Sequence, residues 1–143
     1  MDLCIFCEII KGKIKARKIY ETKHSIAVLD AFPLKEGHTL IISKNHKTKV
    51  EDLSAEENTD VFSTLHFLTS HIEKTFESNS TLIAIHNGKE AGQDIPHVHI
   101  HIIPIKKSDQ STAIHSMFTR EKISEKKLDE IWIKIVDTIK QKN

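Results

Sequence analysis

The most distinctive chemistry in this sequence lies in the segment HVHIHIIP, residues 97–104, where histidine occupies every second position from residue 97 to residue 101. Successive side chains of a β-strand point to opposite faces, so His97, His99 and His101 share one face at spacings of roughly 7 Å. The valine and isoleucines between them then point into a core. A row of imidazoles packs poorly, and we therefore expect this face to border a cleft.

Histidines in this arrangement are suited to nucleophilic catalysis at phosphorus. A neutral imidazole, available near pH 7, can attack phosphorus and form a covalent intermediate that water later hydrolyses. Neighbouring histidines can orient the nucleophile or give a proton to the leaving group. His99 has a histidine on each side and is the predicted nucleophile. Backbone N–H groups of Gly88, Gly92 and Gln93, in the preceding loop, can meet phosphate oxygens.

A metal site is the rival use of these histidines. Zinc is bound by cysteine thiolates and histidine imidazoles in tetrahedral sets of four. Cys4 and Cys7 are the only cysteines, in a Cys-x-x-Cys. His46 and one end histidine of the row would complete the set. The alternative is two reduced cysteines in an N-terminal turn, and a thioredoxin-like redox role is weaker because no βαβ unit begins here.

Length and composition indicate one soluble globular domain over residues 1–143. The chain has 143 residues and a formal net charge of +1, so no strong field draws nucleic acid or a membrane surface. No apolar run approaches the ~20 residues of a membrane span. Two cysteines without a secretion signal predict a cytoplasmic protein.

The hydrophobic pattern predicts an α+β fold with an antiparallel sheet, one long helix and a C-terminal helix. Strands are expected at residues 18–22, 25–30, 38–43 and 81–86, and a last one from residue 97 that Pro104 ends. Ser54 and Glu57 form a capping box at the start of the long helix, whose apolar residues recur at three- and four-residue steps to Phe76. Residues 105–120 are expected to be loop, and about 120–142 a helical extension.

These residues resemble the histidine-triad (HIT) superfamily, whose motif is His-x-His-x-His followed by two apolar residues. Four blocks match in order and spacing over a core of residues 4–104: CIFCEIIKGKI, VLDAFPLKEGHTLIISKNH, NGKEAGQ and HVHIHIIP. The branch it is most similar to is the bacterial-type, nucleoside-phosphoramidase-like one with a Cys-x-x-Cys. The resemblance implies a HIT-like fold and a homodimer.

The resemblance also implies a role for each histidine of the motif. His99 is the nucleophile that takes the nucleoside monophosphoryl group, His101 contacts phosphate, and His38 is the remote histidine that supports them. His97 is the first motif histidine. In zinc-carrying relatives that position joins a structural zinc site, whose ligands here would be Cys4, Cys7, His46 and His97.

The nucleotide pocket follows from the same resemblance. Asp30 matches the acidic residue that holds the ribose hydroxyls through a charge-assisted hydrogen bond. The loop residues Gly92 and Gln93 belong to the phosphate end of the pocket. The apolar walls of the purine pocket would be formed by Ile5, Phe6, Ile9, Leu29 and Ala31. The alternative for each of these residues is an ordinary position in the hydrophobic core.

Two residues depart from the family pattern. His86 stands where relatives usually have an asparagine near the nucleophile, and an imidazole there carries a charge that varies with pH. Asp94 stands where a serine commonly contacts the substrate phosphate, and a carboxylate there repels phosphate unless it is protonated, turned away or paired. These changes either reduce turnover or alter the preferred substrate.

The predicted function is hydrolysis, or nucleotidyl transfer, at the α-phosphorus of purine nucleoside phosphoramidates or related nucleotides, without a redox cofactor. A diadenosine-polyphosphate hydrolase of the same superfamily is the second enzyme hypothesis. A nucleotide-binding adaptor with little catalysis is the third, and it is motivated by His86 and Asp94.

Overall fold

The structure is a computed structural model that describes residues 3–109 and 116–141. The chain divides into two compact units, residues 1–109 and residues 110–143. The boundary lies just beyond the predicted core of residues 4–104.

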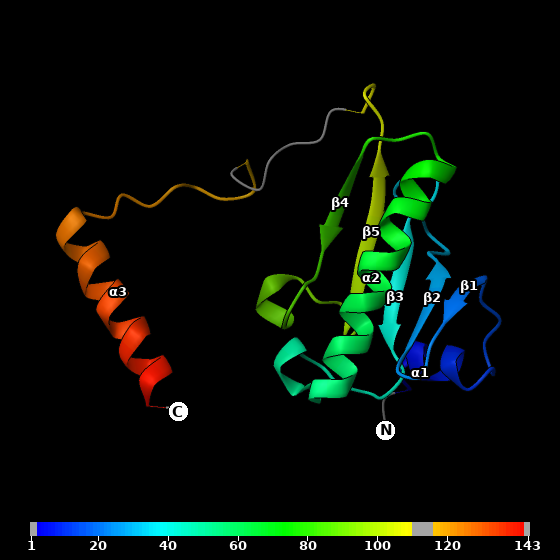
Figure 1. Cartoon of the computed structure of the whole chain (residues 1–143), viewed down its shortest axis with the longest axis horizontal. Coiled ribbons are helices and arrows are strands. Elements are labelled where there is room, and N and C mark those ends of the chain that lie inside the picture. Colours follow the sequence, from blue (N-terminus) through cyan, green and yellow to red (C-terminus); the bar gives the residue numbers. More distant parts are fainter. Residues whose placement is uncertain (1–2, 110–115, 142–143) are drawn as a thin grey trace. The chain divides into compact units, whose positions relative to one another are not determined.

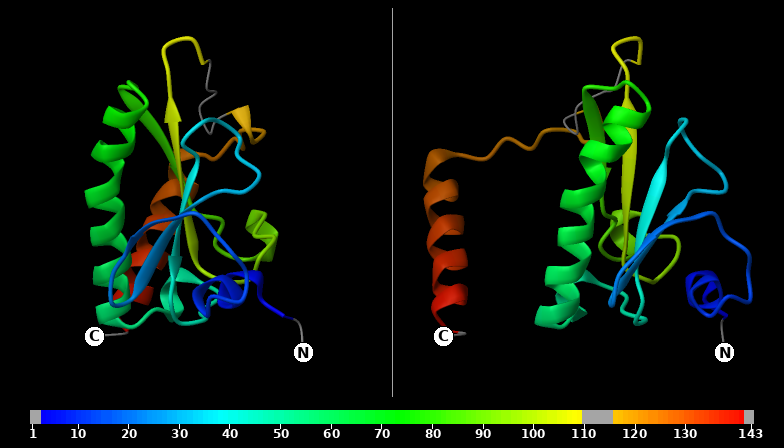
Figure 2. Two further views of the ribbon diagram at one scale, coloured as in Figure 1. Left: turned by 90° about the vertical axis from the view of Figure 1, so that its right-hand side faces the viewer. Right: turned by 45° about the vertical axis from the view of Figure 1, so that its right-hand side comes forward.

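The first unit is built on a five-stranded antiparallel sheet in the order β1-β2-β3-β5-β4 (Figure 1). The long helix α2 crosses one face, and the short helix α1 lies on the opposite side of the sheet (Figure 2). The predicted α+β class and antiparallel sheet are therefore confirmed. The strands are β1 Lys18–Glu21, β2 Ser25–Leu29, β3 Thr39–Ser43, β4 Ser80–Ala84 and β5 His99–Ile105.

Helix α2, Ala55–Thr75, begins where the capping box predicts. The Ser54 hydroxyl accepts a hydrogen bond from the Glu57 backbone N–H at 3.2 Å, and the Glu57 carboxylate accepts one from the Ser54 N–H at 2.8 Å. Two N–H groups that the helix itself leaves unpaired are thus satisfied. The face towards the sheet is buried at Val61, Thr64, Leu68 and Ile72.

Strand pairing determines which side chains share a face of the sheet. Ile100 is paired with Ile41, and both belong to the buried cluster under α2. On the other face His101 is paired with Leu40 and His99 with Ile42. Leu40 and Ile42 pack there with Phe6 of α1. The prediction that Ile100 and Ile102 enter the core while the histidines face the other way is confirmed, and Val98, predicted with them, is also buried.

The structure differs from the sequence predictions at two places. Strand β5 begins at His99 and continues through Pro104 to Ile105, instead of starting at residue 97 and ending at the proline. Pairing with β3 stops at Ile102, and proline is tolerated where a strand has a neighbour on one side only. Helix α1, Ile5–Ile10, is an element that the sequence pattern did not predict, and it places Cys4 at its N-cap and Cys7 within it. Six residues are too few to show a helical period.

Three further helical segments complete the described elements. Two single 3-10 turns, η1 Val50–Asp52 and η2 Lys89–Ala91, lie in the connections of the first unit. In the second unit the predicted C-terminal helix is α3, Glu125–Lys140, which begins after Ser124. Part of the predicted loop, residues 110–115, lies outside the described residues. No helix in the described part of the chain is long and apolar enough to cross a bilayer.

Gly37, which precedes His38, gives a test of this packing. Its φ is +86°, and a Cβ there would meet the ring of Phe76 at the end of α2. Gly12 has a similar φ of +75° but no atom within 4 Å of such a Cβ. Gly12→Ala is expected to cost about 1–2 kcal/mol of backbone strain, and Gly37→Ala about 1–3 kcal/mol more from overpacking. Urea denaturation measures the difference, and equal losses would contradict the described contact.

Candidate active site

His99 is held by the main chain of the segment that leads into its strand. Its Nδ1 lies 2.6 Å from the carbonyl oxygen of His97. A carbonyl only accepts, so Nδ1 carries the proton and Nε2 keeps its lone pair. Burial lowers the pKa of His99 below the usual value for histidine, so the imidazole is neutral near pH 7. A buried, neutral and oriented imidazole with a free Nε2 is a competent nucleophile.

The tautomers of His38 and His101 follow from one backbone N–H. The N–H of Leu34 donates to Nδ1 of His38 at 3.1 Å, so His38 carries its proton on Nε2. That Nε2 donates to Nδ1 of His101 at 2.9 Å, which leaves the proton of His101 on its own Nε2. A carboxylate oxygen of Asp30 lies 3.5 Å from the same Nε2 of His38. His101 therefore presents an N–H donor next to His99, whose ring centroid is 5.1 Å away.

Burial keeps both of these supporting histidines neutral. It lowers the pKa of His38. In His101, burial together with the neighbouring histidines His99, His38 and His86 lowers the pKa to about 4. The relay from His38 to His101 consequently keeps its donor direction across the neutral pH range.

A cavity of about 400 Å³ opens beside His99 and His101. All of the residues predicted to bind nucleotide line it: Ile5, Phe6, Ile9, Leu29, Asp30, Ala31, His86, Gly92, Gln93 and Asp94. Two predicted residues of the catalytic set lie outside its lining. His38 stands behind His101, and His97 belongs to the cluster of cysteines and histidines described below.

The loop after β4 forms one wall of the cavity and uses its own N–H groups internally. The N–H of Gly88 donates to the Gln93 side chain, that of Gln93 to the Gly88 carbonyl, and that of Gly92 to the Lys89 carbonyl. The Gln93 amide also donates to the Thr48 carbonyl at 2.8 Å. As folded, the loop therefore lacks the free N–H groups predicted for phosphate at these three positions. The Gln93 side chain anchors the loop instead.

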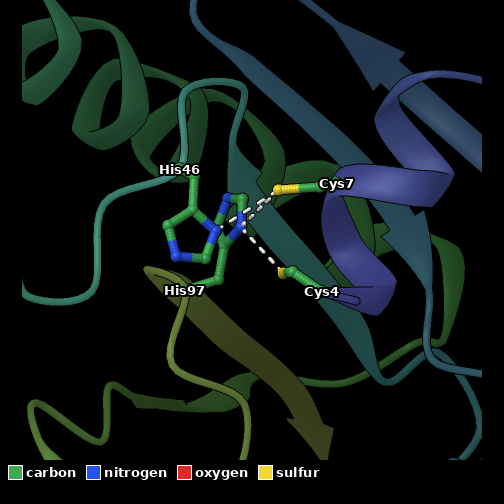
Figure 3. A group of neighbouring side chains, drawn as sticks. All are labelled: Cys4, Cys7, His46 and His97. Carbon is green, nitrogen blue, oxygen red and sulfur yellow. Dashed lines mark hydrogen bonds between the residues drawn. The ribbon is translucent and has the colours of Figure 1, made fainter. Parts of the chain in front are cut away.

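The four predicted metal ligands come together near the N-terminal end of α1 (Figure 3). Their donor atoms, Sγ of Cys4 and Cys7 and one nitrogen each of His46 and His97, all lie within 4.8 Å of one another. Nδ1 of His97 is 3.3 Å from the Cys4 sulfur, and Nδ1 of His46 is 3.3 Å from the Cys7 sulfur. In a tetrahedral site with metal–ligand distances of about 2.0–2.3 Å, neighbouring donor atoms are separated by distances similar to these nitrogen–sulfur distances.

The tautomer of His97 also suits a metal. Its Nε2 lies 2.6 Å from the carbonyl oxygen of Ser43, so Nε2 carries the proton and the Nδ1 lone pair points to the sulfurs. His97, two residues before β5, is completely buried. The other ligands of the cluster come from the start of α1 and from the segment after β3. The set of two thiolates and two imidazoles is one that zinc prefers.

The family assignment follows from comparison with known proteins. The HIT domain family matches residues 11–108. This chain belongs to the HIT family. It is 40% identical over 111 residues to the adenosine 5'-monophosphoramidase HNT1 of Saccharomyces cerevisiae, covering 78% of this chain and 67% of that protein. It is 39% identical over 101 residues to an asymmetrical bis(5'-nucleosyl)-tetraphosphatase of Schizosaccharomyces pombe, covering 71% of this chain and 56% of that protein.

Solved HIT structures share the fold. A histidine triad nucleotide-binding protein from Candida albicans superposes with a TM-score of 0.84 at 30% identity, covering 99% of this chain and all of that one. A zinc-bound histidine triad family protein from Mycobacterium smegmatis has a TM-score of 0.71 at 29% identity, covering 87% of this chain and 86% of that one. The chain thus has the HIT fold.

Some residues of this HIT site were not foreseen from the sequence. Lys15 and Arg17 line the cavity from the segment between α1 and β1. That segment has no motif and no clear period, so only the folded chain reveals the position of the two cations. Both departures from the family pattern, His86 and Asp94, do lie on the cavity wall.

Proposed function

We propose that this HIT protein hydrolyses purine nucleoside phosphoramidates or related nucleotides at the α-phosphorus. The observation that carries the proposal is the fixed, neutral His99, whose free Nε2 lies at a cavity of about 400 Å³. Nε2 attacks phosphorus, and the amine leaves with a proton. Water then cleaves the phosphorus–nitrogen bond to His99 and releases the nucleoside monophosphate.

The remaining residues bind and orient the substrate. His101 donates its Nε2–H to a phosphate oxygen, and His38 maintains that tautomer. Asp30 accepts hydrogen bonds from the ribose hydroxyls through the lone pairs left by its contact with the Phe32 N–H. The apolar residues of α1 and of the end of β2 enclose the purine.

A diadenosine-polyphosphate hydrolase is the second candidate, favoured by the tetraphosphatase relative from Schizosaccharomyces pombe. Both candidates use the same attack by His99 and differ in the leaving group, an amine in one and a nucleotide in the other. Comparing kcat/KM for an adenosine phosphoramidate and a diadenosine polyphosphate separates them.

The nucleophile assignment predicts that His99→Ala abolishes AMP release from an adenosine phosphoramidate while AMP binding remains measurable. Removing the attacking atom removes the covalent route, whereas the cavity walls stay in place. His71→Ala is the control, since His71 is exposed on α2 and its Nδ1 bonds to the Phe67 carbonyl. Equal and negligible turnover by wild type and His99→Ala across a nucleotide panel would favour a nucleotide-binding adaptor instead.

We further propose that Cys4, Cys7, His46 and His97 hold a structural zinc ion. The donor distances, the buried Nδ1 of His97 and the zinc-bound relative from Mycobacterium smegmatis support this assignment. A bound zinc ion would tie α1 to the ends of β3 and β5 as a cross-link. Thiolate ligands persist in a reducing compartment, and on that ground we propose a cytoplasmic location, which cell fractionation tests.

The zinc proposal predicts about one zinc ion per chain in untagged protein analysed by elemental mass spectrometry. Cys4→Ser and Cys7→Ser each weaken retention of the metal, because a hydroxyl is a poor substitute for a thiolate. His71→Ala again serves as a control that keeps it. Purified protein that is stable and metal-free, with the thiols reduced, would contradict the proposal.

We also propose a homodimer in which the β4 edges of two copies meet. Among the described residues strand β4 pairs only with β5, and its side chains Leu82 and Ile83 are 44% and 43% exposed. An unpaired, apolar strand edge is a template for pairing with another chain. A twofold axis would place the same strand on both sides of the interface.

The dimer proposal predicts that wild-type protein sediments with twice the chain mass and that Ile83→Lys shifts it towards the monomer. Desolvating a lysine in the interface opposes association. Ile19→Lys is the matched control, because Ile19 is 43% exposed on β1 at the opposite edge of the sheet. A monomeric wild type, or dissociation by Ile19→Lys alone, would contradict it.

A further inference from the structure

His86 follows β4 and lines the same cavity as His99 and His101. Its ring centroid lies 5.9 Å from that of His101, with the ring planes at 89°. The proposed mechanism assigns no step to this histidine.

The loop fixes which nitrogen of His86 faces the cavity. Nδ1 lies 2.7 Å from the carbonyl oxygen of Ala91 and therefore carries a proton. Gly92 allows this close approach: with φ at +88°, a Cβ there would lie 3.1 Å from the same Nδ1. Because the loop occupies Nδ1, Nε2 is the nitrogen left for a ligand.

The other histidines of the site are committed to different tasks. His99 needs the lone pair of its Nε2 for attack, and His101 uses its Nε2–H on phosphate while Nδ1 accepts from His38. Burial and the neighbouring histidines hold the pKa of His101 at about 4, so it carries no extra proton near pH 7. The expulsion of an amine still requires a proton from elsewhere.

Charged groups of both signs line the cavity together with His86. The titratable or charged residues in that lining are His99 and His101 from β5, Asp30 after β2, Asp94 in the loop, and Lys15 and Arg17 before β1. The substrate adds an anionic phosphoryl group beside the carboxylates. An imidazolium with Nδ1–H on a carbonyl and Nε2–H on the substrate satisfies both of its donors.

We propose that His86 is the proton donor for the leaving group, an inference that rests on the proposed attack by His99. As Nε2 of His99 bonds to phosphorus, the phosphorus–nitrogen bond of the phosphoramidate breaks and its electron pair takes the proton from Nε2 of His86. The amine departs, and His86 is left neutral with Nδ1–H still on Ala91. Water then attacks phosphorus, the bond to His99 breaks, and the proton released by water returns to His86.

Two substrates that differ in their need for a proton test this role. One is an adenosine phosphoramidate with an alkylamine leaving group, which must be protonated. The other is the p-nitrophenyl ester of AMP, whose phenolate departs without a proton. His86→Asn and His86→Gln are compared with wild type between pH 5 and 9, with AMP affinity measured in parallel. His71→Asn is the control, because His71 also bonds through Nδ1 to a main-chain carbonyl.

The donor must carry its proton, so wild-type kcat/KM on the alkylamine falls as the pH is raised across the measured range. On the alkylamine substrate at low pH, both His86 variants should have a kcat/KM roughly 100-fold below that of wild type, and this kcat/KM should no longer fall as the pH rises. On the ester, their loss of kcat/KM should be at least tenfold smaller. His71→Asn should match wild type.

The proton-donor role is overturned if a His86 variant loses equal kcat/KM on the two substrates, or if its kcat/KM on the alkylamine still falls as the pH rises. Neither result would affect the proposed attack by His99 and the release of AMP. If wild type and His99→Ala turn over neither substrate, the proposed function has failed and the inference falls with it. Retained AMP affinity in either His86 variant shows that a lost rate reflects chemistry and not a collapsed cavity.

Discussion

The register between β3 and β5 is the constraint on which the site depends. It pairs His99 with Ile42 and His101 with Leu40, while Ile100 pairs with Ile41 under α2. Side chains alternate with a period of two, so a slip of one residue would bury the imidazoles under the helix and expose the isoleucines. Because Ile41, Ile100 and Ile102 have no exposed surface, the cost of that slip is the whole core on this side of the sheet. Hydrophobic burial thus sets the position of the nucleophile.

Main-chain groups then decide what each imidazole can do. The His97 carbonyl keeps the Nε2 lone pair of His99 free, the Ser43 carbonyl turns the Nδ1 lone pair of His97 to the cysteines, and the Leu34 N–H sets the tautomers of His38 and His101. Identical side chains thereby acquire different roles, which neither their number nor their spacing reveals. Burial reinforces the assignment by lowering the pKa of His99 and His101.

Local patterns predicted the parts of the fold that local physics determines. The capping box located the start of α2, and two-residue alternation identified the faces of β5. Helix α1 was missed because six residues show no period, and the end of β5 was misplaced because the tolerance for Pro104 depends on where β3 stops. Zinc chemistry made His46 a candidate partner of Cys4 and Cys7, but the complete set with His97 came from family resemblance, since only the fold closes so long a separation in sequence. Lys15 and Arg17 had no local pattern at all.

His97 links the cluster of cysteines and histidines to the catalytic face. Its side chain meets the cysteine sulfurs, and its carbonyl oxygen orients His99 two residues later. Phe6 of α1 makes a second link, with its ring edge against both imidazoles at centroid distances of 5.8 Å and 4.9 Å. Helix α1 has only six residues and would be marginal alone. Whatever fixes its cysteines also fixes Phe6 and the apolar wall of the cavity. The cluster can therefore govern the precision of the active site without touching a substrate.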